Sequence, residues 1–256
     1  MLFVKRLLLL VGVKQIIEAP MNVIAIIRQF VSYYAFRKQS TTRKDLEVSV
    51  SDISLVLNES TAATSYDKHY VYHTAWAARA LRKYHPQSHI DISSSLQFVA
   101  IVSAFVDITF YDYRPPLIKL PGLKVDKVDL LNLPFQDNSI RSLSCMHVVE
   151  HIGLGRYGEP LDANGDVKAI RELKRVLAEG GTLFFVVPLG QPRVCFNNCR
   201  VYSYEQIVNY FKPLRVHGFA FVNGPDEGDD GLLIPEKPQE YVKSKSYGCG
   251  CFEIVK

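Results

Sequence analysis

Three acidic residues and a histidine lie at or just past the ends of apolar runs, where a chain leaves a buried strand. Asp91 lies in HIDI, Asp112 follows ITFY, Asp129 follows VDKV and His147 follows LSCM. Asp112 comes roughly 20 residues after Asp91, a spacing that suits a carboxylate accepting hydrogen bonds from ribose hydroxyls. Asp129 can accept a hydrogen bond from an adenine amino group. These residues indicate a nucleoside-containing ligand.

A series of strands and helices must position these side chains. Apolar runs predict strands over residues 89–92, 106–111, 125–130, 140–147, 182–187, 214–222 and 247–255. Apolar residues at helical spacing predict helices over residues 66–84, 96–105, 166–178 and 204–211. This alternation predicts an α/β fold, namely a Rossmann-like, mostly parallel seven-stranded sheet with helices on both faces.

Ligands of such sheets bind outside the carboxyl ends of the strands. The predicted site therefore comprises the segments that follow the strands: Asp91–Ser95, Asp112–Arg114, Asp129–Asn132, His147–His151 and Pro188–Gln191. The first of these turns holds three serines and no glycine, although backbone that approaches a ligand closely favours glycine. A dinucleotide needs the G-x-G-x-x-G cradle for its pyrophosphate, and the absence of that motif argues against one.

The site segments occur in an order that resembles a known family. In chain order they are DISSS, FYDYRPP, VDLLNLPFQDNS, SCMHVVEHI and AIRELKRVLAEGGTLFFVVP. Together they resemble the class I S-adenosylmethionine-dependent methyltransferases over roughly residues 66–256. The run HIGLGRYGEPLDANGDVKAIRELKRVL is similar to an uncharacterised branch of that superfamily, catalogued as a domain of unknown function.

The resemblance implies S-adenosylmethionine as the cofactor, and it implies that the last strand of the sheet runs antiparallel. It places Asp91 and Ser93 by the methionine end of the cofactor and Asp112 on the ribose. It places Asp129 and the Leu130 backbone on the adenine, with His147 bordering the cofactor. Family members usually carry glycine where Ser93 stands, so a side chain there crowds the cofactor.

Methyl transfer needs positioning and, for some acceptors, a general base. Glu150 and His151 follow the fourth predicted strand and are the candidate catalytic residues; the alternative is that this pair is structural. Arg156 and Tyr157 lie in a glycine-rich loop that we expect to cover the pocket and contact the substrate. Arg200 is the third candidate substrate residue.

A helix ahead of the first strand and four cysteines leave alternatives open. His69, Tyr70 and His73 either roof the cofactor or form a partly buried aromatic face. Cys195-x-x-x-Cys199 and Cys249-Gly-Cys251 are predicted to approach the same sheet edge, where four thiols suit a zinc site or disulfides. We interpret them as unrelated free thiols, and no residue is predicted as a metal ligand.

The first 60 residues are predicted to be a basic leader, and residues 61–256 the methyltransferase-like domain. Residues 1–50 hold eight of the Lys and Arg residues against three acids, whereas the rest of the chain is close to neutral. Such a body does not suit nucleic acid. Residues 21–36 predict an amphipathic helix that packs on the body or a second copy, or that lies on a membrane surface.

The sequence therefore predicts a cytoplasmic methyltransferase that uses S-adenosylmethionine and acts on a small-molecule or glycan-type acceptor. Peripheral attachment to a membrane is the alternative location. A non-catalytic binding or scaffold protein with the same fold is the alternative function, and Ser93 in the first turn favours it.

Overall fold

The computed structural model describes the chain except for residues 1–22, 41–42, 44, 58 and 229. The chain divides into two units, one that ends at Tyr66 and one that runs from Asp67 to Lys256. The boundary predicted between residues 60 and 61 lies just ahead of this division. All the predicted site residues belong to the second unit.

In the first unit, residues 23–39 form an α-helix, and a short 3-10 helix, η2, follows at Val50–Asp52. The predicted amphipathic helix is thus helical over its described part, and its first two residues lie outside the described residues. Apolar side chains such as Ile24 and Val31 are exposed on it. Among the described residues, no helix combines the length and the apolar character that a membrane crossing requires. Binding of this helix to a membrane or a second copy stays a prediction.

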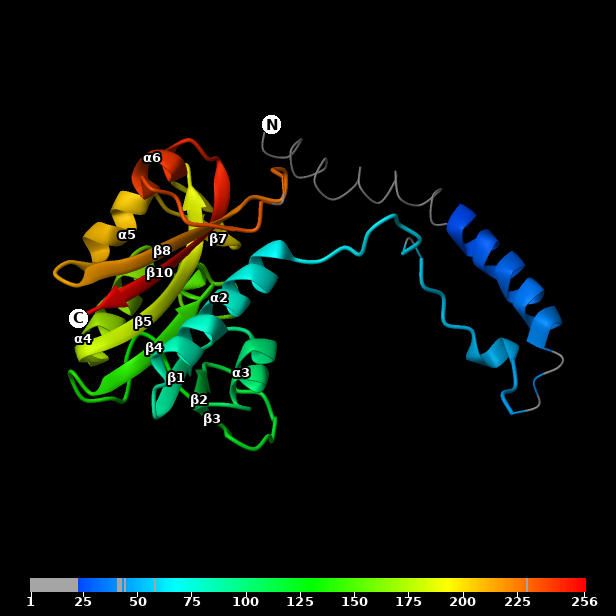
Figure 1. Ribbon diagram of the computed structural model, residues 1–256, viewed down its shortest axis with the longest axis horizontal. Helices are drawn as coiled ribbons and strands as arrows, with labels where there is room; N and C mark the ends of the chain where they lie inside the picture. Colours follow the sequence, from blue (N-terminus) through cyan, green and yellow to red (C-terminus); the bar gives the residue numbers. More distant parts are fainter. Residues whose placement is uncertain (1–22, 41–42, 44, 58, 229) are drawn as a thin grey trace. The chain divides into compact units, whose positions relative to one another are not determined.

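An eight-stranded sheet organises the second unit, in the order β3-β2-β1-β4-β5-β10-β8-β9 (Figure 1). Strands β1 to β5 pair in parallel, and β10 runs antiparallel to both β5 and β8. The bounds are β1 Ser88–Ile92, β2 Asp107–Asp112, β3 Leu123–Lys127, β4 Ile140–Met146, β5 Leu177–Gly190, β8 Arg215–Asn223, β9 Leu232–Leu233 and β10 Tyr247–Val255. This confirms the predicted Rossmann-like α/β fold and its antiparallel last strand.

Three short elements depart from the prediction. The sheet has an eighth strand because β9 pairs with Phe221 and Val222 of β8. A hairpin of β6 (Arg193–Cys195) and β7 (Cys199–Val201) follows β5, and helix α6 (Pro238–Lys243) precedes β10. Elements this short do not complete enough periods for an apolar pattern to reveal them.

Helices cover both faces of the sheet, as predicted. The remaining helices are α2 Lys68–Tyr84, α3 Leu96–Val102, α4 Gly165–Val176 and α5 Tyr204–Phe211. Buried residues of α2 and α3, such as Leu81 and Val99, share one core, and buried residues of α4 and α5, such as Leu173 and Phe211, share the other. The central strand β5 is buried along most of its length because both cores pack on it.

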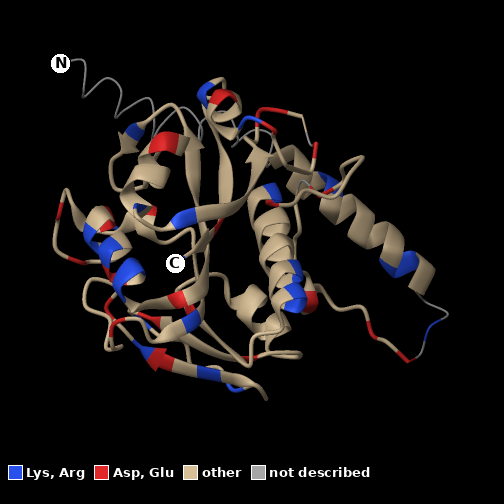
Figure 2. Cartoon of the chain, turned by 60° about the vertical axis from the view of Figure 1, so that its left-hand side comes forward, with Lys and Arg blue, Asp and Glu red and all other residues tan. Residues whose placement is uncertain are grey.

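Local signals in the sequence account for the ends of these helices. Asp67 caps α2 by accepting a hydrogen bond from the Tyr70 amide, and Ser203 with Gln206 forms a capping box at α5. Basic residues lie in the last turns of α2 and α4, where they suit the helix dipole (Figure 2). His69 and His73 are buried residues of the first two turns of α2, on the same side of the helix as the buried Ala77 and Leu81.

The connections on either side of β3 carry no helix in this fully described part of the chain. Strand β3 also ends at Lys127, earlier than the predicted end at residue 130. The chain turns at Asp129, which forms a bridge with Asn132. This early turn brings Asp129 and Leu130 into a loop beside the strand ends, so the loop conformation, and not the strand, sets their position.

Candidate active site

A cavity of about 350 Å³ lies at the carboxyl ends of the parallel strands. It is lined by residues that follow β1 to β4 and by the loop after η3 (Val149–His151). The predicted site residues among them are Ser93, Asp112, Asp129, Leu130, His147, His151 and Tyr157. The predicted residues Asp91, Glu150, Arg156 and Arg200 do not line it. The cavity is where the topology of a parallel sheet places a ligand site.

The turn after β1 is built around Asp91, which is fully buried. Its Oδ1 accepts a hydrogen bond from the Ser94 amide at 3.0 Å, and its Oδ2 accepts one from the Ser144 hydroxyl. Burial raises the pKa of Asp91 to about 6, while the bonds from Ser144 and Ser94 oppose that shift. Asp91 therefore stabilises the turn through its bonds to Ser94 and Ser144, and it does not line the cavity.

Ser93 has a φ of 53°, in the left-handed region that favours glycine. Its amide donates to the carbonyl oxygen of Tyr111 at 2.7 Å, and its hydroxyl donates to the same oxygen at 3.2 Å. The turn thus keeps the backbone shape of a glycine turn, and the side chain is bonded to strand β2. This geometry reduces the crowding that the sequence predicted at this position.

The two acids on the other side of the turn are held by local bonds. Asp112 Oδ1 accepts from the Arg114 amide at 2.7 Å, and Asp129 Oδ1 accepts from the Leu131 amide at 2.9 Å. Each carboxylate has a second oxygen that can accept a hydrogen bond from a ligand. Leu130, which directly follows Asp129, is buried and supplies apolar lining. This wall can bind hydroxyl and amino groups.

His147 forms the opposite wall and has a φ of 57°. Its Nδ1 lies 2.8 Å from Glu150 Oε1, and its Nε2 lies 3.3 Å from the sulfur of Cys249. Burial on its own lowers the pKa of His147, but its contacts with the Cys249 sulfur and the Glu150 carboxylate oppose burial and raise the pKa above its ordinary value. Glu150 is itself buried and lies behind His147, so it does not reach the cavity as a catalytic base would.

His151 and Tyr157 close the cavity from the loop after η3. The Nδ1 of His151 lies 2.6 Å from the carbonyl oxygen of Asn198, and an Arg156 guanidinium nitrogen lies 3.1 Å from the same Nδ1 and 3.3 Å from the same carbonyl oxygen. The carbonyl oxygen can only accept, so the shorter contact assigns the ring proton to Nδ1 and leaves Nε2 as the acceptor nitrogen. The Arg114 guanidinium lies 4.6 Å from the Tyr157 ring centroid, a cation–π contact. The contact joins the loop to the segment after β2 across the cavity.

Arg200 is buried, and its guanidinium bonds to other groups of the protein. Its guanidinium donates to the carbonyl oxygens of Ile152 at 2.7 Å and Asp162 at 3.3 Å, and its Nε lies 3.6 Å from the Asp166 carboxylate. These bonds hold the ends of the loop together. The placement argues against direct contact between Arg200 and a substrate, and Arg156 lies outside the cavity as well.

All five cysteines are free, in agreement with their interpretation as free thiols, and no disulfide joins the four that the sequence singled out. Cys195 and Cys199 oppose each other in the β6–β7 hairpin. Cys249 instead lies near His69 and His147. Sequence reasoning singled out each of these residues separately but missed the grouping. The spacing of His69 and His73 indicates that they share one face of α2, but it carries no information about His147 or Cys249.

The burial of these histidines perturbs their protonation. His73 is fully buried, and burial lowers its pKa to about 3, with further lowering by His147. Burial also lowers the pKa of His69. Burial raises the pKa of the Cys249 thiol well above its ordinary value. The cavity therefore has an acidic, solvent-facing wall and, on its other side, a wall formed by His147. Behind His147 lie the desolvated side chains of His69, His73 and Cys249, and His147 together with these is called the His–Cys wall.

Residues 135–225 match the family model described as "Caenorhabditis protein of unknown function, DUF268". Among solved structures, the N-methyltransferase NodS from Bradyrhizobium japonicum, solved with S-adenosyl-L-homocysteine, is similar at a TM-score of 0.50 and 14% identity. That match covers 73% of this chain and 87% of NodS. A putative sarcosine dimethylglycine methyltransferase from Galdieria sulphuraria matches at a TM-score of 0.49 and 13% identity, covering 72% and 85% of the two chains. A search of the curated proteins found no match.

The predicted resemblance is therefore confirmed in two respects. The family model is of the domain-of-unknown-function kind that the sequence indicated, and the fold is similar to that of the methyltransferase NodS. At 14% identity, the likeness to NodS establishes the fold, whereas the ligand and the acceptor must be argued from the site.

Proposed function

We propose that the cavity binds S-adenosylmethionine and that the protein is a methyltransferase for a small-molecule or sugar-type acceptor. The observation that carries this proposal is that Asp112 and Asp129, after consecutive parallel strands, line one cavity together with His147 and His151. The volume of about 350 Å³ falls in the range of small-molecule sites. Bound S-adenosylmethionine supplies an activated methyl group.

The roles of the lining residues follow from their positions. Asp112 accepts hydrogen bonds from the ribose hydroxyls, and Asp129 with the Leu130 backbone binds the adenine. The Ser93 turn is the side of the cavity for the methionine portion. The left-handed backbone at Ser93 supports this assignment, because it leaves the turn in the shape that glycine provides in the family.

His151 is the proposed general base for the acceptor. Its Nδ1 proton is committed to the Asn198 carbonyl, so Nε2 is available to take a proton. Tyr157, which lines the cavity from the same loop, is the proposed acceptor contact. Glu150 is proposed to act through His147, which it holds in place, and not on the acceptor.

Calorimetric titration with S-adenosyl-L-homocysteine tests this proposal, with Asp112→Asn as the variant and Asp107→Asn as the matched control. The two acids lie at opposite ends of β2, and Asp107 is exposed at the end away from the cavity. We expect wild type and the Asp107 variant to bind equally and the Asp112 variant to bind at least about tenfold more weakly, because it loses a charge-assisted bond. Failure of wild type to bind at millimolar ligand would refute the cofactor assignment.

The second candidate function is binding without catalysis, and the serine at position 93 favours it. A protein of this kind would bind S-adenosyl-L-homocysteine in the same titration but would transfer no methyl group. Methyl transfer from labelled S-adenosylmethionine to a panel of small hydroxyl and amine acceptors distinguishes the two. Transfer that is lost in His151→Gln with retained ligand binding supports the enzyme.

A further inference from the structure

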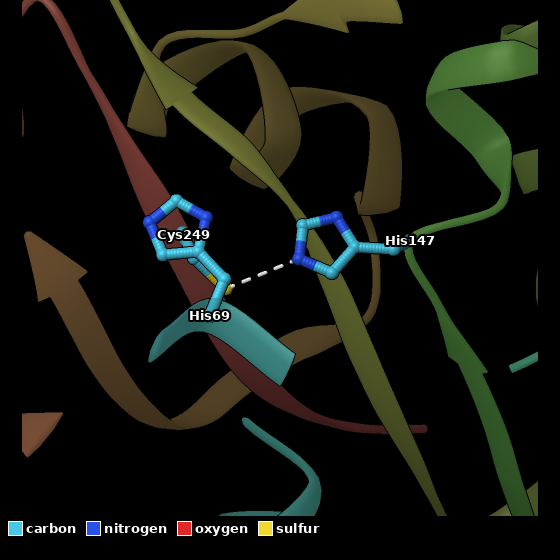
Figure 3. Close-up of side chains that lie close together, drawn as sticks. All are labelled: His69, His147 and Cys249. Atoms are coloured by element: carbon cyan, nitrogen blue, oxygen red, sulfur yellow. Dashed lines mark hydrogen bonds between the residues drawn. The ribbon is translucent and has the colours of Figure 1, made fainter. Parts of the chain in front are cut away.

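Three potential metal ligands from distant parts of the chain converge beside the cavity. His69 comes from the first turn of α2, His147 follows β4, and Cys249 lies on β10 (Figure 3). One ligand atom from each lies within 4.8 Å of the others. We propose that His69, His147 and Cys249 bind a tetrahedral Zn²⁺ ion, with a fourth coordination position open.

The separations between the ligand atoms of His69, His147 and Cys249 are close to those around a tetrahedral zinc ion. Zinc binds sulfur at about 2.3 Å and imidazole nitrogen at about 2.0–2.1 Å, so tetrahedral ligand atoms are roughly 3.3–3.7 Å apart. His147 Nε2 and Cys249 Sγ already lie 3.3 Å apart. His69 would approach by about one ångström, a shift within the reach of side-chain torsions. The arrangement therefore needs no change in the fold.

Hydrogen bonds leave one nitrogen of each histidine for the metal. The Nε2 of His69 lies 3.1 Å from the carbonyl oxygen of Asn223, and the Nδ1 of His147 lies 2.8 Å from Glu150 Oε1. Both oxygens accept, so these nitrogens carry ring protons, and His69 Nδ1 and His147 Nε2 remain for coordination. Metal-bound histidines are anchored in this way by a carbonyl or a carboxylate.

Two unpartnered atoms border the cluster and point to a ligand. His73 Nε2 and Glu150 Oε2 are buried side-chain atoms that have no hydrogen-bond partner among the described residues. The ring of His73 lies 5.0 Å from that of His147. Since His73 Nδ1 donates to the His69 carbonyl at 2.6 Å, its Nε2 is an acceptor. Water on the fourth position of the metal would give this nitrogen a donor, and buried polar atoms in proteins rarely lack one.

The backbone of β10 explains why the sulfur points toward the histidines. Gly248 and Gly250 lie on one face of the strand, where a Cβ would meet Phe221 at 2.2 Å and Leu189 at 2.3 Å. Cys249 therefore lies on the other face, in the core that α2 covers. Packing on one face of β10 thus requires glycine at positions 248 and 250. Because side chains alternate along a strand, the residue between them presents its thiol on the other face.

The ligand chemistry selects the metal. Two imidazoles and a thiolate are a borderline-soft set that suits zinc, whereas calcium and magnesium prefer oxygen. Cys249 coordinates as the thiolate and His147 through an unprotonated Nε2, so the proton on the Cys249 sulfur and any proton on His147 Nε2 pass to solvent as the metal–sulfur and metal–nitrogen bonds form. Three protein ligands and an open position are the arrangement of catalytic zinc sites. His147 also lines the cavity, so the ion would lie at the cavity wall.

Cobalt titration of the full chain, purified in the presence of a chelator and then freed of it, tests the site. We expect one equivalent of Co²⁺ to give the visible bands of tetrahedral cobalt and a near-ultraviolet thiolate-to-cobalt band. One equivalent of Zn²⁺ should remove both. Cys249→Ser should abolish the thiolate band and weaken binding more than about 100-fold, since loss of an outer partner alone costs about 10–100-fold.

Cys251→Ser is the matched control, because Cys251 is buried on the same face of the same strand. It should retain the bands and the stoichiometry, and circular dichroism establishes that both variants are folded. Glu150→Gln should keep the bands and weaken Co²⁺ binding about 10–100-fold. The proposal is overturned if wild type shows no tetrahedral bands at one equivalent, or if Cys249→Ser keeps the thiolate band. None of these readouts depends on S-adenosylmethionine.

Discussion

The two walls of the cavity are built in opposite ways. On the acid wall, Asp112 and Asp129 each bond to a backbone amide two residues further on. On the His–Cys wall, His147 meets Cys249, which is 102 positions away, and His69 comes from a helix ahead of the sheet. The first wall is made of solvent-facing local turns and the second of buried long-range contacts. This difference predicts that the stability of the fold depends mainly on the His–Cys wall, whereas ligand binding depends on both walls.

The largest effect is expected from His147→Ala, which leaves the buried Glu150 carboxylate without its partner. The two side chains are 7% and 1% exposed, and removing one member of a buried pair costs about 3–5 kcal/mol. Urea unfolding in the presence of a chelator measures this loss. The surface pair His217–Glu253, in which His217 is 54% exposed, is the control. His217→Ala should cost less than about 1 kcal/mol, and equal costs would refute the distinction between the walls.

A smaller loss of stability is expected from Arg175→Met, because Arg175 attaches the loop of the acid wall to helix α4. Arg175 donates to the carbonyl oxygens of Leu133 and Phe135 and pairs with Glu172 and Asp137, which anchors the loop that carries Asp129. Arg175→Met should therefore lower the free energy of unfolding measurably, but by less than His147→Ala, because solvent screens the partly exposed guanidinium. Lys168→Met, which loses only a surface pair with Asp162, is the control.

The ion pair between Arg175 and Glu172 predicts that the free energy of unfolding depends on pH. Arg175 lowers the pKa of Glu172 below its ordinary 4.5, with further lowering by the Leu133 amide, although burial opposes the shift. A lowered folded pKa means stability that is present above pH 4.5 and is lost as pH falls through the folded value. Urea unfolding from pH 6 to pH 3 should show this loss in wild type and less of it in Arg175→Met. An unchanged slope in the variant would contradict the assignment.

Ser93→Gly tests the turn between the walls. A residue with a Cβ in the left-handed region destabilises the folded state by about 1–2 kcal/mol, and glycine removes this strain. Glycine also loses more backbone entropy on folding, which offsets about 0.5–1 kcal/mol of the gain. The variant should therefore be more stable by at most about 1.5 kcal/mol. It should also bind S-adenosyl-L-homocysteine more tightly, because the cavity loses a hydroxyl. Weaker binding would show that the hydroxyl contributes to the ligand site, and Ser95→Gly is the matched control outside the left-handed position.

The smallest change in stability is expected from Asp129→Asn. The residue is exposed, and the amide oxygen of asparagine can still accept the bond from the Leu131 amide. Stability should stay within about 0.5 kcal/mol, while affinity for S-adenosyl-L-homocysteine falls. Urea unfolding and calorimetry on the same preparation measure the two effects. A large loss of stability with unchanged affinity would show that the acid wall is structural as well.

The position of residues held by local bonds could be predicted from the sequence. The acids Asp112 and Asp129 lie in the cavity, because strand ends and turns are visible as apolar runs followed by polar residues. Arg200 and Glu150 were misplaced, because the sequence cannot tell a buried charge with internal partners from one that faces a ligand. The end of β3 was also missed, since the turn at Asp129 depends on its bridge with Asn132.

The sequence by itself determined the alternation of strands and helices, and with it the sheet edge where the site lies. It also determined which acids follow which strands, because those properties depend on neighbours a few residues apart. Only the tertiary structure decided that His69, His147 and Cys249 meet. Their approach depends on the order of β4, β5 and β10 in the sheet and on how α2 packs across it. Such long-range packing leaves no period or motif in the chain.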